Sequence, residues 1–171
     1  MELDKYIINV ENFPKEGIVF KDITPLLNDK DAFKYAIDEM TKIVNKLNPD
    51  VIIGSEARGF IFACAIAYAT NKRFVPVRKK NKLPRETYSQ EYFYEYNNEC
   101  LEIHKDAIKE GDTVVLVDDL LATGGTAKAQ IELVKKCKGK ILGSVFLIDL
   151  VNLHEEDVFD GVNYESILKY N

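Results

Sequence analysis

The sequence lacks the features that mark secreted, membrane-spanning and disulfide-stapled proteins. It contains no tryptophan and only three cysteines, which are scattered and form no CxxC pair. An odd number of separated cysteines argues against a disulfide framework and favours reduced thiols. No apolar run approaches the ~20 residues that span a bilayer. The first five residues also lack the basic and then apolar pattern of a secretory signal. We therefore expect a cytoplasmic protein with no membrane partner.

A surplus of basic residues is also missing. The 171 residues include 23 Lys and Arg against 28 Asp and Glu, which gives a net charge of −5. This balance argues against a general nucleic-acid-binding protein, although a local cationic pocket remains compatible with it. Hydrophobic residues make up 46% and charged residues 30%, a composition typical of globular proteins. At about 100–200 residues per domain, residues 1–171 are expected to form a single domain.

The hydrophobic pattern alternates between helical and strand periodicity. Helices are predicted over 33–47, 60–69 and 128–138, and strands over 50–54, 73–77, 113–118 and 141–150. This order predicts an α/β fold with a mostly parallel central sheet flanked by helices. In such sheets, ligands bind beyond the carboxyl ends of the strands.

Two segments do not follow this alternation. Residues 1–30 are interpreted as an irregular cap. Residues 78–99 are polar and charged and include four tyrosines. A long segment between two strands is usually functional or disordered, so we interpret it as a hinged lid or a protruding hairpin.

The segment from Val114 to Thr126 carries the clearest chemical signal. An apolar strand ends in Asp118 and Asp119, and a small glycine-rich turn and a helix follow. Carboxylates at a strand end can accept hydrogen bonds from vicinal hydroxyls. The turn offers backbone N–H groups, threonine hydroxyls and the positive end of the helix to a phosphate. Each part alone could be an ordinary helix entry or tight turn. Together they predict a ribose 5-phosphate site.

Other phosphate-binding motifs fit poorly. Residues 54–59 have the glycine spacing of a P-loop, but Phe60-Ile61 stands where that motif needs Lys and then Ser or Thr. No G-x-G-x-x-G follows any predicted strand. The sequence therefore disfavours a nucleoside triphosphatase or a dinucleotide-dependent enzyme.

The 114–126 segment resembles the phosphoribosyl pyrophosphate (PRPP) signature of type I phosphoribosyltransferases, and in particular of the members that use adenine. Residues 13–22, 56–60 and 75–79 resemble further segments of the same family. The resemblance implies the type I phosphoribosyltransferase fold. It further implies a small N-terminal hood to which residues 1–30 contribute and a mobile catalytic loop over residues 78–99.

The resemblance also implies a role for each site residue. The ribose 5-phosphate would contact Asp118, Asp119, Ala122, Thr123, Gly124, Gly125 and Thr126. Pyrophosphate would contact Glu56, Ala57, Arg58, Arg78, Lys79 and Lys82, with a cis peptide expected at Glu56-Ala57. Adenine would contact Val19, Phe20, Lys21 and Leu150. An ordinary core position for Phe20, and a solvated surface run for residues 78–82, are the structural alternatives.

Glu95 is the third expected catalytic residue, beside Asp118 and Asp119. By its position before Leu101, it falls where the family has a glutamate next to the base. Proton transfer by such a group contributes about 10²–10⁴-fold to a rate. Glu86, Glu91 and Glu99 are nearby alternatives.

The implied reaction transfers ribose 5-phosphate from PRPP to adenine, giving AMP and pyrophosphate in purine salvage. Mg²⁺ is the implied cofactor, held mainly by the oxygens of PRPP or pyrophosphate and not by a protein cage. The resemblance also implies a homodimer. Two alternatives stay open: a phosphoribosyltransferase for hypoxanthine, guanine, xanthine or orotate, and a PRPP- or purine-sensing regulator that binds nucleic acid.

Overall fold

The computed structural model describes residues 1–94 and 97–171, so the expected catalytic Glu95 lies outside the described residues. The chain divides into two compact units, residues 1–39 and residues 40–171. The boundary falls inside helix α2 (Lys30–Leu47), which ends just before Asn48-Pro49, as the sequence predicts. No helix in the described part of the chain is both long and apolar enough to cross a membrane.

The first unit is more regular than the irregular cap that the sequence suggests. A short 3-10 helix, η1 (Leu3–Tyr6), precedes an antiparallel hairpin of β1 (Ile8–Glu11) and β2 (Val19–Asp22), and α1 (Thr24–Asn28) follows. The prediction was wrong because most side chains of these two strands are exposed or only half-buried. They therefore lack the apolar alternation that marks a strand in a sequence.

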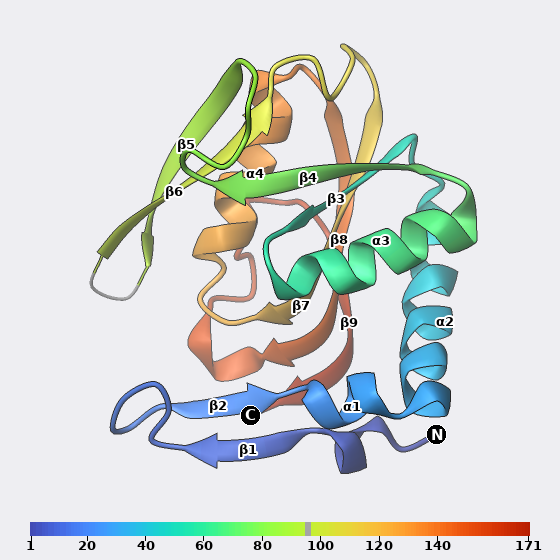
Figure 1. Cartoon of the computed structure of the whole chain (residues 1–171), viewed down its shortest axis with the longest axis vertical. Helices are drawn as coiled ribbons and strands as arrows, with labels where there is room; N and C mark the ends of the chain where they lie inside the picture. The colour runs from blue at the N-terminus through green and yellow to red at the C-terminus, as the bar shows by residue number, and fades with distance from the viewer. Residues whose placement is uncertain (95–96) are drawn as a thin grey trace. The chain divides into compact units, whose positions relative to one another are not determined.

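The second unit is built on a seven-stranded sheet, which Figure 1 shows. Its spatial order is β5-β6-β4-β3-β7-β8-β9. The strands are β3 (Val51–Ser55), β4 (Arg73–Lys79), β5 (Thr87–Tyr94), β6 (Asn97–His104), β7 (Thr113–Leu121), β8 (Lys140–Leu150) and β9 (Tyr164–Tyr170). Strands β4, β3, β7, β8 and β9 are parallel to one another, whereas β6 is antiparallel to both β4 and β5. The predicted mostly parallel sheet is confirmed.

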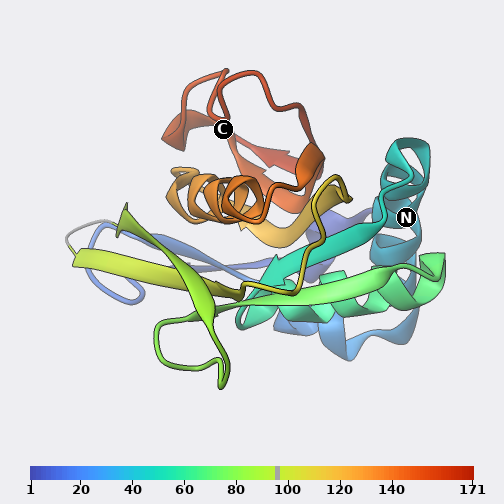
Figure 2. The same cartoon turned by 90° about the horizontal axis from the view of Figure 1, so that it is seen from above.

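Helices α3 (Arg58–Thr70) and α4 (Gly125–Lys136) cover opposite faces of this sheet (Figure 2). Val51 and Ile53 of β3 pack in one core cluster with Ile131 and Val134 of α4. Gly54, which has the opposite parity, faces α3. The period-two alternation of a strand thus places its apolar side chains against both helical layers, which explains why β3 is apolar throughout.

Strand β9 has no counterpart among the strands predicted from the sequence. Its side chains are mostly half-buried, because the strand lies at the edge of the sheet with β8 as its neighbour. An edge strand with few buried side chains does not produce the continuous apolar run by which β3 and β7 are recognised.

The polar segment that the sequence interprets as a lid or a hairpin forms the hairpin of β5 and β6. Its second strand extends to His104, beyond residue 99. Tyr88 and Tyr92 of β5 pack against the core cluster, and Lys136 Nζ of α4 donates a 2.5 Å hydrogen bond to the carbonyl of Ser89. The tyrosines thus attach the hairpin to α4.

Candidate active site

A pocket of about 200 Å³ lies at the carboxyl ends of β3 and β7. Residues 55–59 and 118–127 line it, together with Phe146 of β8. Two loops that are some sixty residues apart in the sequence meet there, because β3 and β7 are adjacent parallel strands and their carboxyl ends share one edge. The pocket occupies the place that the sequence predicts for the ribose 5-phosphate site.

Asp118 is the most deeply held acid of this pocket. Ser55 Oγ donates to its Oδ2 at 2.9 Å, and the backbone N–H of Asp119 donates to its Oδ1 at 2.9 Å. The amide of the buried Gln130, on α4, lies 3.5 Å from the same Oδ2. Burial, followed by the charge of Asp119, raises the pKa of Asp118 to about 8. The ligand-free pocket therefore favours the protonated form of Asp118 at neutral pH.

Asp119 is paired with the first residue of α3. Its Oδ2 lies 2.7 Å from Arg58 Nε. Burial raises the pKa of Asp119, whereas the guanidinium of Arg58 acts in the opposite direction. The two neighbouring acids thus have different surroundings. Asp118 is held by neutral donors, and Asp119 by a cation that is partly accessible to solvent.

The turn after β7 has the shape expected of a phosphate cradle. Gly124 has φ +85°, in the left-handed region, and the next residue begins α4. A side chain is excluded there, since a Cβ on Gly124 would lie 2.4 Å from Val158 Cγ2. The first N–H groups of a helix have no partner within it, and the helix dipole favours an anion at that end. The turn can therefore bind a phosphate through its backbone.

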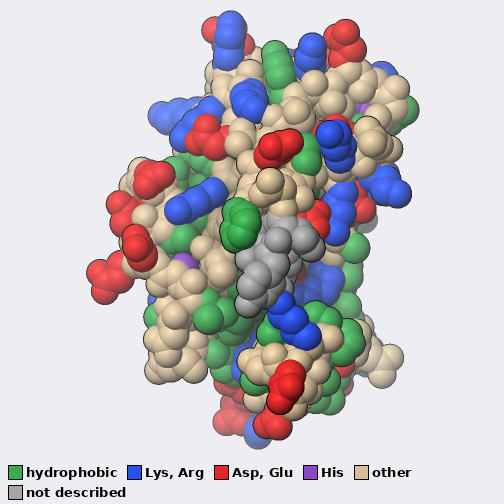
Figure 3. Space-filling model, turned by 90° about the vertical axis from the view of Figure 1, so that its left-hand side faces the viewer, with side chains coloured by type: hydrophobic (Ala, Val, Ile, Leu, Met, Phe, Trp, Pro, Cys, Tyr) green, Lys and Arg blue, Asp and Glu red, His purple; other side chains and the backbone are tan. Residues whose placement is uncertain are grey.

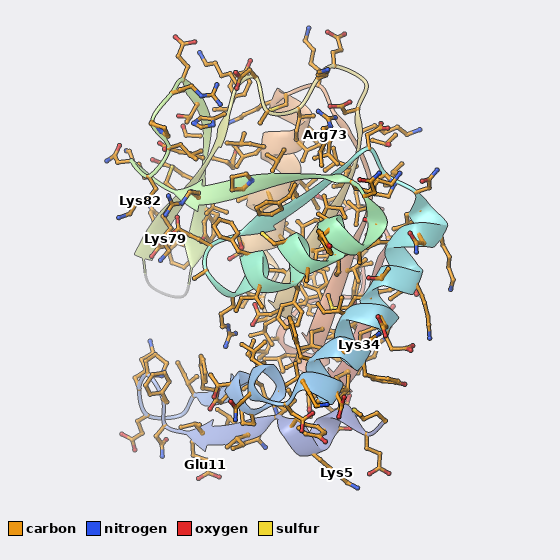
Figure 4. All side chains as sticks on the ribbon, turned by 45° about the vertical axis from the view of Figure 1, so that its right-hand side comes forward. Lys5, Glu11, Lys34, Arg73, Lys79 and Lys82 are labelled. Atoms are coloured by element: carbon orange, nitrogen blue, oxygen red, sulfur yellow. The ribbon has the colours of Figure 1, made fainter. Side chains whose placement is uncertain are left out.

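The expected pyrophosphate residues are only partly brought together. Glu56, Ala57 and Arg58 line the pocket, and the Glu56–Ala57 peptide is cis, as expected. Arg78, Lys79 and Lys82 do not line it. Glu56 Oε1 instead accepts hydrogen bonds from the backbone N–H of Lys79 at 2.7 Å and from Arg78 Nε at 3.2 Å. Figure 4 places Lys79 and Lys82 at the carboxyl end of β4.

The expected adenine residues are divided between the two units. Three of them, Val19, Phe20 and Lys21, are consecutive residues of β2. The ring of Phe20 packs edge-on against Phe13, with 5.2 Å between centroids, and Lys21 Nζ donates to Asn9 Oδ1 at 2.8 Å. Leu150 is the last residue of β8, at the carboxyl end of the sheet.

Sequence reasoning missed the partners of the acids. Ser55 and Gln130 hold Asp118, but both lie outside the 114–126 segment that carries the predicted acids and turn. A sequence signal for this contact was available at Gln130, a polar residue beside the apolar stripe of α4. In the folded protein Gln130 is completely buried. The side chain of His154 is also buried, and its Nε2 lies 2.7 Å from Asp149 Oδ1.

The fold and the pocket define a phosphoribosyltransferase, and the model of the phosphoribosyl transferase domain matches residues 26–169. An adenine phosphoribosyltransferase of Mycoplasma capricolum is 55% identical over 170 residues, which cover 99% of this chain and 100% of that protein. The chain belongs to the adenine phosphoribosyltransferase family.

Solved structures agree with this assignment. The adenine phosphoribosyltransferase of Thermoanaerobacter pseudethanolicus superposes with a TM-score of 0.96 at 47% identity, and covers 99% of this chain and 98% of its own. The enzyme of Saccharomyces cerevisiae, crystallised with an imino-altritol bisphosphate and adenine, gives a TM-score of 0.85 at 35% identity, covering 97% and 96%. The type I phosphoribosyltransferase fold expected from the resemblance is thereby confirmed.

Proposed function

We propose that this protein transfers ribose 5-phosphate from PRPP to adenine, giving AMP and pyrophosphate in purine salvage. One observation carries the proposal: the acids Asp118 and Asp119 and the turn at Gly124 line one pocket. That pocket offers carboxylates to a diol and backbone donors to a phosphate. The yeast relative, which was crystallised with a bisphosphate and adenine, supports the same substrate classes.

Each acid has its own task in this mechanism. The transition state of ribosyl transfer carries positive charge near C1 of the ribose, and preorganised carboxylates stabilise such charge. Burial raises the pKa of Asp119 and the adjacent guanidinium of Arg58 opposes that rise, so the carboxylate of Asp119 would supply negative charge beside the ribose hydroxyls while paired with Arg58. Asp118 accepts a hydrogen bond from one ribose hydroxyl and is held in place by the hydrogen bond from Ser55. The turn binds the 5-phosphate and thereby sets the distance between the acids and the sugar.

Pyrophosphate would leave toward the 56–58 loop. Arg58 lies at the pocket, and its guanidinium has further donors beyond the Nε that faces Asp119. Arg78, Lys79 and Lys82 follow from the adjacent strand, where Glu56 orders the backbone of Lys79. These cations would stabilise the charge that builds up on the leaving group.

Mg²⁺ fits this pocket as an ion bound through the substrate. Among residues 1–94 and 97–171, no three His, Cys, Asp or Glu side chains cluster in a way that could hold a metal ion. The ion would therefore bind through the oxygens of PRPP and water, as Mg²⁺ commonly does with polyphosphates. When bound, it neutralises charge on the pyrophosphate.

Adenine would stack on Phe20 of β2, with Val19 offering backbone groups and Lys21 a cation. Phe20 is half-buried, and its ring packs edge-on against Phe13. Glu95, or one of Glu86, Glu91 and Glu99, would move the proton as N9 attacks.

The decisive experiment measures AMP formed from adenine and PRPP, with and without Mg²⁺. We expect formation that depends on the metal and is abolished by chelation. The double variant Asp118→Asn/Asp119→Asn should lose turnover while its circular dichroism spectrum stays native. Near-normal AMP formation by that folded variant would refute the role of the acids. In the same assay, faster use of guanine than of adenine would refute the substrate assignment.

The regulator alternative has less support. A nucleic-acid-binding face needs clustered cations. On the face that Figure 3 shows, Lys and Arg side chains are interspersed with Asp and Glu side chains. An electrophoretic shift with nucleic acid, without consumption of any base, would favour the regulator instead.

We also propose a cytoplasmic homodimer. The free thiols Cys64, Cys100 and Cys137 favour a reducing compartment. Ile61, Cys64 and Tyr68 are exposed at helical spacing along α3, and Tyr68 is 92% accessible. An apolar helical face of this kind suits a partner copy. Light scattering should give twice the mass of one chain, and Tyr68→Glu should reduce it. A monomer in the wild type would exclude the dimer.

A further inference from the structure

A buried ion pair lies outside the pocket, in the connection that follows β8. His154 Nε2 is 2.7 Å from Asp149 Oδ1, and the two side chains are 2% and 0% exposed. His154 Nδ1 lies 2.9 Å from the carbonyl oxygen of Glu155. A carbonyl can only accept, so the contact with Glu155 requires Nδ1 to donate. Removing one partner of such a buried pair leaves the other without its partner in the interior, so the two side chains hold each other in place.

This pair attaches residues 151–163 to the end of β8. Asp149 is the penultimate residue of the strand, and His154 follows the short helix η2 (Val151–Leu153). Tyr164, at the start of β9, packs edge-on against His154 with 5.9 Å between ring centroids. Burial, followed by the charge of Asp149, raises the pKa of Tyr164. Both ends of the connection thus meet at Asp149.

The same connection reaches the phosphate turn. Val158 is 3% exposed, and its Cγ2 lies 2.4 Å from the position that a Cβ on Gly124 would take. Phe159 stacks on Phe146 with 6.1 Å between centroids, and Phe146 lines the pocket. Phe159 also packs against Tyr164 at 5.6 Å. Continuous packing therefore links the ion pair to the back of the turn.

We propose that Asp149 and His154 are positioning residues of the PRPP site. By fixing the connection, they hold Val158 and Phe159 against the turn at Gly124, so its N–H groups point at the phosphate before the substrate arrives. This proposal rests on the proposed function. A turn that is ordered in advance binds with less loss of conformational freedom than one that must order on binding. Losing the pair should therefore weaken PRPP binding and leave the chemical step intact.

The test compares His154→Leu with His154→Gln, whose amide can still donate to Asp149. We expect His154→Leu to raise KM for PRPP about tenfold, while kcat and KM for adenine stay within about twofold. His154→Gln should restore KM for PRPP to within about threefold of the wild type. His104→Leu, which changes the other histidine of the chain at the end of β6, is the matched control and should behave as wild type.

A second variant keeps the proposal testable if His154→Leu fails to fold. Val158→Ala removes part of the wall behind Gly124 and should raise KM for PRPP in the same way. Since both changes act through the turn, their effects should not add. The double variant should have a KM for PRPP no higher than that of the more impaired single variant. An unchanged KM for PRPP in Val158→Ala would overturn the proposal. So would a His154→Leu enzyme that loses only thermal stability, or that changes all three constants equally. Absence of AMP formation by the wild type would instead refute the proposed function.

Discussion

Gly59 lies against the carboxylate of Asp118, such that a Cβ built on this glycine would come within 2.5 Å of Asp118 Oδ1. The first turn of α3 therefore lies so close to the Asp118 carboxylate of β7 that no side chain fits at position 59. Asp118 is enclosed by Gly59 on one side and by Ser55 and Gln130 on others. Its orientation toward the pocket is a consequence of this enclosure.

Gly59→Ala should reduce activity without unfolding the protein. In an unobstructed helix, replacing glycine with alanine gains about 1 kcal/mol of stability. Here the new methyl group must displace the Asp118 carboxylate, so we expect no such gain and a fall in kcat/KM for PRPP of about tenfold or more. Steady-state kinetics and urea unfolding of the same variant check both statements. A more stable variant with full activity would contradict the contact.

Asp118 should make the ligand-free protein lose stability as the pH rises. Burial raises its pKa from the ordinary value of 3.8 to about 8 in the folded protein, so the folded state holds the proton more tightly. Between these two values the unfolded carboxyl ionises first, and the free energy of unfolding falls with rising pH. Above about pH 8, the stability that the protonated Asp118 contributes is fully lost. Asp118→Asn should show a smaller decrease over this interval in urea titrations.

Asp106→Asn is the control for that experiment. Asp106 is exposed, and the hydrogen bond from Arg85 lowers its pKa below 3.8. Its titration therefore lies outside the interval, and its replacement should leave the pH dependence there unchanged. If Asp118→Asn keeps the wild-type slope, the carboxyl is not protonated in the folded protein at neutral pH.

Arg58→Gln should weaken PRPP binding and disturb Asp119. The change removes the guanidinium 2.7 Å from Asp119 Oδ2, so the pKa of Asp119 should rise further. We expect KM for PRPP to increase about tenfold or more, with a smaller increase for Arg58→Lys, which keeps the charge and loses the planar fork. Arg73→Gln is a matched control. Arg73 pairs with Asp112 at the opposite end of β4 (Figure 4). Equal effects at the two arginines would show that the loss is not specific to the pocket.

Phe20→Ala should raise KM for adenine and leave KM for PRPP nearly unchanged. Stacking of a base on an aromatic ring is worth about 1–3 kcal/mol, so the expected rise is about 5- to 160-fold. Ile8→Ala changes an exposed residue of the partner strand β1 and serves as the control. A Phe20→Ala enzyme with a lower melting temperature and an unchanged KM for adenine would instead identify Phe20 as a core residue of the hairpin.

The acids, the turn and the helix after β7 were predictable because they are contiguous. Residues 113–126 contain a buried strand, two acids near its carboxyl end, a glycine with positive φ and a helix start, and each of these follows from local preferences, although β7 continues to Leu121, past the predicted end at residue 118. The parallel sheet was predictable for a similar reason, since β3, β7 and β8 are buried on both faces and read as apolar runs. The β1–β2 hairpin and β9 were missed because few of their side chains are buried.

The surroundings of the acids were not predictable, since they come from distant parts of the chain. Ser55 and Asp118 are 63 residues apart, and their hydrogen bond exists only because β3 and β7 are neighbours. The raised pKa of Asp118 depends on burial, which is a property of the packed molecule. The separation of Arg58, which lines the pocket, from Arg78 and Lys79, which contact Glu56, likewise depends on strand geometry.

The amino-acid sequence by itself determined which acids and which turn line the pocket, because an apolar strand that runs into acids and glycines places them at the carboxyl edge of a sheet whatever surrounds them. Tertiary structure alone decided how those groups are held: Gly59 against Asp118, Arg58 beside Asp119, and Val158 behind Gly124. The physical reason is that chemical identity is carried by single residues, whereas distance, burial and charge compensation arise only when remote segments pack together.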